Sequence, residues 1–101
     1  MSQVGGQRAR QADVRAAHDA LKLRELSESV VNNKKAIAPA AEPHATLSED
    51  AKAKYREYVA VCAQDLASAE ADLAMRVAEE AAAKEKLRAN YAPPLGTLLG
   101  P

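Results

Sequence analysis

The sequence predicts an all-α protein made of two long helices joined by a proline-containing linker. Apolar residues recur every three or four positions in two long stretches, as they do along one side of an α-helix. Alanine, the strongest helix former, dominates the hydrophobic residues, and the chain contains no Phe and no Trp. Prolines lie between the two stretches and after the second, where they end helices. We therefore expect an extended antiparallel helical hairpin, or rod, with extended N- and C-terminal tails.

The first predicted helix covers about residues 7–33 and follows an N-terminal tail, residues 1–6. Its main stripe, at steps of three and four, consists of Ala9, Ala12, Ala16, Ala20, Leu23, Leu26 or Ser27, and Val30. A second, weaker stripe consists of Val14, Ala17 and Leu21. Two asparagines, Asn32 and Asn33, then weaken the helix because their side chains compete for backbone hydrogen bonds.

Residues 34–46 form the predicted linker. Pro39 and Pro43 lack an amide proton, and each biases the residue before it toward extended geometry. The segment is longer than a tight connection between helices, so we expect it to lie along a surface of the protein.

The second predicted helix covers residues 47–91 without a glycine or proline. Thr46 and Glu49 match a capping box at its start, and Ser48 is an alternative N-cap. At 1.5 Å per residue such a helix is about 65 Å long. A compact domain of this size has a radius of gyration of only about 13 Å, so the helix is expected to project as a rod.

Two rows of apolar residues run side by side along the second helix. The row of larger residues consists of Ala51, Tyr55, Tyr58, Cys62, Leu66, Ala69, Leu73 and Val77. The neighbouring row consists of Ala60, Ala63, Ala67, Ala71, Ala74, Ala78 and Ala82. The mean step in both rows exceeds 3.6 residues, which is closer to an eleven-residue repeat than to a heptad. A heptad continued from Tyr55 and Tyr58 would place Asp65 and Asp72 in the seam. This spacing favours straight or slightly right-handed packing over a long left-handed coiled coil.

Most residues of the two rows form the predicted helix-packing and partner interface. They are Tyr55, Tyr58, Cys62, Leu66, Ala69, Leu73 and Val77 of the first row, and Ala60, Ala63, Ala67, Ala71 and Ala74 of the second. Alanine side chains allow helix backbones to approach more closely than the usual 8–10 Å, although alanine also simply favours helix formation. The face is broader than one helix can cover, so part of it is expected to bind another chain. The sequence leaves open whether the first helix packs within its own chain or on a neighbour.

Residues 92–101 form an apolar tail without a charged side chain. Its leucines, Leu95, Leu98 and Leu99, are too few to cross a membrane, and no apolar run in the chain approaches the roughly 20 residues that a span requires. The tail is therefore predicted to be a docking peptide that fills a groove on a neighbour.

The residues that could carry chemistry are isolated from one another. His18 and His44 have no partner at metal-ligand spacing, so neither a metal nor another cofactor is expected. The single cysteine, Cys62, lies in the apolar row and is interpreted as a small packing residue. A pair of helices offers no cleft in which catalytic groups could be arranged, and we expect no enzymatic activity or small-molecule substrate.

The composition argues against a nucleic-acid partner and against secretion. Basic and acidic residues are balanced at 14 each, which supplies no global field for nucleic acid. One cysteine cannot form an intrachain disulfide, which favours an intracellular or virion-associated protein over a secreted one.

A thin, alanine-rich core with an excess of apolar surface predicts a subunit that depends on other protein subunits or on copies of itself. We expect a non-enzymatic structural component of a large assembly, such as a virus or phage particle or an organellar complex. The alternative is a soluble, self-associating adaptor, chaperone or regulator, and a nucleic-acid-associated protein is less favoured still.

Overall fold

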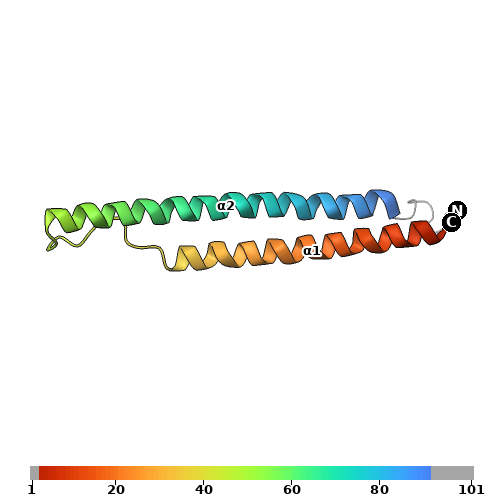
Figure 1. Cartoon of the computed structure of the whole chain (residues 1–101), viewed down its shortest axis with the longest axis horizontal. Helices are drawn as coiled ribbons and strands as arrows, with labels where there is room; N and C mark the ends of the chain where they lie inside the picture. Colours follow the sequence, from red (N-terminus) through yellow and green to blue (C-terminus); the bar gives the residue numbers. More distant parts are fainter. Residues whose placement is uncertain (1–2, 92–101) are drawn as a thin grey trace, which may run out of the picture. The chain divides into compact units, whose positions relative to one another are not determined.

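The structure, a computed structural model, describes the backbone of residues 3–91 and the side chains of residues 9–90. It contains two helices, α1 (Gln3–Ala36) and α2 (Glu49–Tyr91), and no strand within the described range (Figure 1). The predicted all-α fold and helical hairpin are confirmed, whereas several helix ends differ from the prediction.

The start of α1 lies at Gln3 and not at Gln7. The helix therefore includes most of residues 1–6, which were predicted as a tail. Gly5 and Gly6 each cost about 1 kcal/mol relative to alanine in a helix, but they do not prevent one. Because a long helix is already nucleated after them, each added residue only extends it.

The end of α1 lies at Ala36, beyond the asparagines that were expected to end it. The amide of Ile37 still donates to the Asn33 carbonyl at 3.1 Å. Lys34 and Lys35 occupy the last turn, where positive charge interacts favourably with the helix dipole. Pro39 then disfavours helical geometry in the residue before it, which stops the helix.

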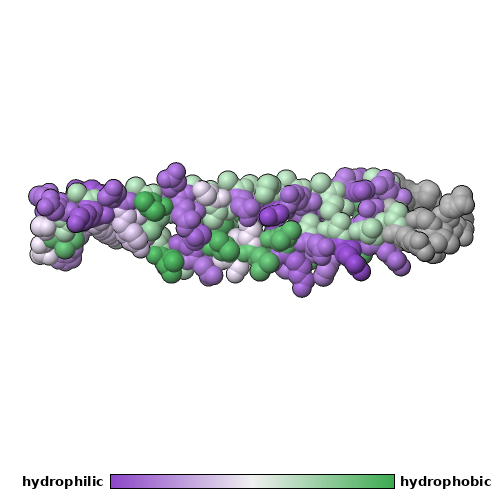
Figure 2. Space-filling view, viewed as in Figure 1, coloured by the Kyte–Doolittle hydropathy of each residue, from purple (hydrophilic) through white to green (hydrophobic). Residues whose placement is uncertain are grey.

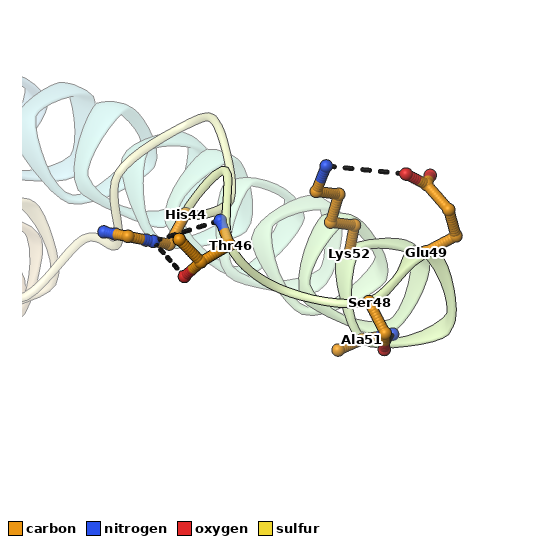
Figure 3. A network of polar contacts seen from close by, with 6 residues as sticks. All are labelled: His44, Thr46, Ser48, Glu49, Ala51 and Lys52. Carbon is orange, nitrogen blue, oxygen red and sulfur yellow. Dashed lines mark hydrogen bonds and ion pairs between the residues drawn. The ribbon is translucent and has the colours of Figure 1, made fainter.

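The start of α2 is capped by Ser48 and not by Thr46 (Figure 3). The Ala51 amide donates to Ser48 Oγ at 3.2 Å, and the Lys52 amide donates to the Ser48 carbonyl at 2.9 Å. Thr46 is engaged elsewhere, because its hydroxyl lies 2.7 Å from His44 Nδ1. The predicted capping box therefore does not form, and the alternative cap does.

The chain divides into two compact units. One contains the first part of α1, up to Glu25, and α2 from Arg76 onward. The other is Leu26–Met75, with the end of α1, the linker and the first part of α2. We refer to them as the terminal unit and the linker unit.

Polar side chains join the helices in the linker unit. Ser27 Oγ donates to Asp72 Oδ2 at 2.9 Å, and Lys34 Nζ lies 2.5 Å from Asp65 Oδ2. The residue numbers rise on α1 as they fall on α2, so the two segments are antiparallel. The linker also contacts α2, because the Tyr55 hydroxyl donates to the carbonyl of Ala40 at 2.7 Å.

In the terminal unit, α1 and α2 are also antiparallel and are joined by ion pairs. Arg24 Nε donates to Glu80 Oε1 at 2.8 Å, and Lys86 Nζ lies 3.4 Å from Asp13 Oδ1. Each pair combines a residue of α1 with an oppositely charged residue of α2.

The residues protected from solvent follow a heptad on both helices, in contrast to the predicted eleven-residue spacing. We call these positions the seam. On α1 they include Asp13, Ala17, Ala20, Arg24, Ser27, Val31 and Lys34. On α2 they include Lys52, Tyr55, Val59, Cys62, Leu66, Ala69, Leu73, Arg76, Glu80, Ala83 and Leu87. The steps alternate between three and four, as in a coiled-coil seam. The prediction failed because it excluded charged residues from the seam. Here Asp13, Arg24 and Lys34 of α1 each pair with a charged residue of α2, while Lys52 and Arg76 form ion pairs within α2.

Very little apolar surface is removed from solvent. Among the described side chains, Val31 is the one buried hydrophobic residue, at 3% exposure, and Ser27 and Glu80 are also buried. The hairpin therefore has a line of half-covered side chains in place of a closed hydrophobic core.

Candidate partner-binding surface

The main stripe predicted on the first helix is mostly exposed, and of its members only Ala20 and the alternative Ser27 lie on the seam. Leu26 and Val30 are 64% and 45% exposed, while Ser27 and Val31 take the buried positions beside them. The weaker predicted stripe contributes instead, since Ala17 and Leu21 are half-buried. Hydrophobicity alone favoured a side of α1 that is mostly exposed. It gave no weight to polar and charged residues such as Arg24 and Ser27, which contact α2.

The row of larger residues on α2 is divided between seam and surface. Five of its predicted interface residues are half-buried at or beside the seam: Tyr55, Cys62, Leu66, Ala69 and Leu73. Tyr58 and Val77 are exposed instead, and Val59 takes the seam position predicted for Tyr58. The row was thus assigned to the correct side of α2, with errors of one residue at Tyr58 and at Val77, where Val59 and Arg76 occupy the seam.

The predicted alanine row is exposed throughout. Its members within the linker unit are Ala60, Ala63, Ala67, Ala71 and Ala74. None of them occupies a protected position on the seam, so close packing of α1 against this row does not occur in the described structure. The row remains a prediction for contact with another chain.

A groove lies in the linker unit where α1 ends, with a volume of about 200 Å³. It is lined by Lys34, Ile37, Ala38, Pro39, Tyr58, Val59, Cys62, Ala63, Asp65 and Leu66. Figure 2 shows hydrophobic residues gathered near this end of α1. Sequence reasoning missed the groove because Ile37 belongs to the linker and was not assigned to either helical row.

Tyr58 supplies a polar group beside this apolar surface. Its hydrogen bond with Cys62 raises the pKa of the Tyr58 hydroxyl above its usual value, and the nearby charge of Cys62, partial burial and Tyr55 act in the same direction. The rings of Tyr55 and Tyr58 are tilted, with centroids 6.3 Å apart. The hydroxyl therefore stays protonated near neutral pH, so the groove carries no tyrosinate charge.

The terminal unit contains a cluster of charges centred on Glu80. Arg24 contacts one carboxylate oxygen at 2.8 Å, and Lys84 lies 3.1 Å from the other. These two hydrogen-bonded cations hold the pKa of Glu80 below its ordinary value. The cluster binds the two helices to each other through the contact between Arg24 of α1 and Glu80 of α2.

The remaining predictions concern the tail and chemical sites. Leu95, Leu98 and Leu99 lie outside the described residues. Within residues 3–91 no group of three or more His, Cys, Asp and Glu side chains is placed to hold a metal ion. Neither described helix has an apolar stretch of the length that crossing a bilayer requires.

The chain was compared with known protein families, with curated proteins and with solved structures, and it matches none of them.

Proposed function

We propose that this chain is a non-enzymatic structural subunit of a larger protein assembly, such as a virus or phage particle or an organellar complex. It docks through the alanine row of α2 and through residues 92–101. The observation that carries the proposal is the nearly absent core: one buried hydrophobic residue is described, while ten large hydrophobic residues are exposed.

Covering the exposed apolar residues of the hairpin with a partner lowers its free energy. Full burial of a large apolar side chain contributes about 1.5–3 kcal/mol, whereas ordering the backbone of one residue costs about 1–2 kcal/mol. A hairpin with so little buried apolar surface gains much by covering its exposed residues with a partner. The exposed alanine row suits this role because small side chains allow a second helix to approach closely.

The test is affinity purification of the tagged chain from its native cells, with identification of the proteins that accompany it. Truncation after Tyr91 is expected to leave the helical circular dichroism signal nearly unchanged and to reduce the recovered partners. Normal assembly of the truncated chain would show that residues 92–101 have no docking role. Recovery of the intact chain without any partner would contradict the proposed function itself.

A self-associating adaptor or chaperone is the second candidate, favoured by the open groove in the linker unit. Light scattering separates the two functions. A discrete oligomer of the purified chain with a cooperative melt supports the adaptor. A chain that frays or aggregates alone, and orders only with its partners, supports the assembly subunit. Salt-dependent binding to DNA would contradict both proposals.

A further inference from the structure

The groove in the linker unit has the chemistry of a site for an uncharged, apolar segment. Its lining contains two charged side chains, Lys34 and Asp65, and these form an ion pair with each other at 2.5 Å. The groove therefore offers no unmatched charge to an occupant. Ile37 is 78% exposed and Tyr58 is 57% exposed, so apolar surface on both sides of the groove is open to solvent.

The chain itself contains a segment of matching chemistry. Residues 92–101 carry no charged side chain, and no stretch of equal length elsewhere in the sequence shares this property. Leu95, Leu98 and Leu99 supply apolar side chains. The two prolines that precede them restrict the backbone, which lowers the entropy lost when such a segment binds.

The geometry of α2 excludes the chain's own tail as the occupant. Leu66 is the lining residue nearest to the end of α2, and the helix from Leu66 to Tyr91 spans about 37 Å at 1.5 Å per residue. Leu99, the last of the three leucines, follows Tyr91 by eight residues, which reach about 28 Å even when fully extended. The segment that fills the groove must therefore belong to another molecule.

We propose that the groove binds residues 92–101 of a second copy of this chain. The inference rests on the proposed docking role of residues 92–101. It identifies the groove as their binding site and a second copy of this chain as the molecule to which they bind. Each copy then offers one groove and one tail. The contact is heterologous, so it joins copies head to tail into rings or open chains.

Sedimentation velocity of the full-length chain over a range of concentrations tests the proposal. The unmodified chain is expected to form a series of head-to-tail species whose size grows with concentration, in contrast to the single discrete oligomer that supports the adaptor. Ile37→Ser, which damages the groove, and the double variant Leu98→Ser/Leu99→Ser, which damages the tail, should each weaken self-association at least about tenfold, or about 1.4 kcal/mol. Val61→Ser is the matched control, because Val61 is 62% exposed in the same unit and does not line the groove.

Mixing the two damaged variants gives the sharpest result. The Ile37→Ser chain retains a tail and the tail variant retains a groove, so together they form one productive contact. The expected product is a one-to-one complex that neither variant forms alone. Circular dichroism should show unchanged helix content, since Ile37 lies beyond the last residue of α1.

Three results would overturn the proposal: unchanged self-association of Ile37→Ser, an equal loss in Val61→Ser, or no complex in the mixture. A full-length chain that stays monomeric also overturns it. The proposed function would survive that outcome if affinity purification still recovers other proteins, so the two ideas fail separately.

Discussion

Glu80 is the most completely covered charged side chain in the described structure, at 7% exposure. Arg24 of α1 and Lys84 of α2 contact its two carboxylate oxygens. A buried carboxylate is costly when it is unpaired, so these contacts stabilise one arrangement of the two helices in the terminal unit. At this seam position a charge with its partners replaces the hydrophobic residue of an ordinary coiled coil.

The lowered pKa of Glu80 predicts a pH-dependent contribution to stability. The folded-state pKa lies below the ordinary value of 4.5, so the unfolded state binds the proton more readily. The stabilisation is therefore present above about pH 4.5 and is lost as the pH falls through the lower, folded-state pKa. Glu80→Gln is expected to melt at a lower temperature than the unmodified chain at pH 7, and this difference should shrink below pH 4.5.

Melting curves followed by circular dichroism from pH 7 to pH 3 measure this effect. The control is Glu79→Gln, which removes the same charge from an exposed neighbour that pairs with Arg76. A difference between Glu80→Gln and the unmodified chain that is constant across this pH range would contradict the assignment.

Val31 provides the clearest test of the small core. It is 3% exposed, so Val31→Ala removes two buried carbon atoms and leaves a small void. The expected loss in the free energy of unfolding is about 2 kcal/mol, measured by urea denaturation. Val61→Ala, at a position that is 62% exposed, should change stability by no more than about 0.5 kcal/mol. Equal effects of the two substitutions would show that Val31 is not buried in solution.

At the scale of the helices, their existence was predictable and their ends were not. Both helices have long apolar periodicity and few helix breakers, and local sequence is sufficient to recognise such segments. Helix ends depend on contacts beyond the local sequence. Lys34 extends α1 past the asparagines and pairs with Asp65 of α2, while Thr46 is unavailable as a cap because it contacts His44.

The N-cap of α2 gives a prediction at this scale. Ser48→Ala removes the acceptor for the Ala51 amide and should lower the free energy of unfolding by about 1 kcal/mol. Thr46→Ala removes a similar hydroxyl that makes no cap, and its effect should be below about 0.5 kcal/mol. Urea denaturation of the two variants compares them directly. A larger loss in the free energy of unfolding for Thr46→Ala than for Ser48→Ala would contradict the Ser48 cap and support the capping box predicted from the sequence.

At the scale of the whole molecule, apolar surface is left over after the helices have paired. In the linker unit, Leu26 and Val30 of α1, the groove, and the alanine row from Ala60 to Ala74 remain at least partly open to solvent after the helices have paired. Single exposed hydrophobic residues are common on proteins, whereas contiguous surfaces of this kind mark sites of interaction. This surplus is the physical basis of the proposed assembly role.

A bulky charged substitution tests the alanine row. Ala67→Arg places a long side chain where a second helix would approach, so it should abolish recovery of partners in affinity purification. Helix content by circular dichroism should not change, because Ala67 is exposed. The control is Ser68→Arg, the same substitution at the next exposed position, which points about 100° away around the helix. Retained partners in Ala67→Arg would assign docking to another surface.

The sequence by itself determined the all-α class, the two helices and the proline-rich break between them, because helix propensity and periodicity act over a few neighbouring residues. It also identified the middle of the seam on α2, from Cys62 to Leu73, where large apolar residues outweigh alanine. On α1 the apolar residues and the polar pairs favour different sides of the helix. Only the tertiary structure could decide between them, since Arg24, Ser27 and Lys34 are explained by Glu80, Asp72 and Asp65 on the opposite helix. Those partners are more than thirty residues away in the chain, beyond the range of any local pattern.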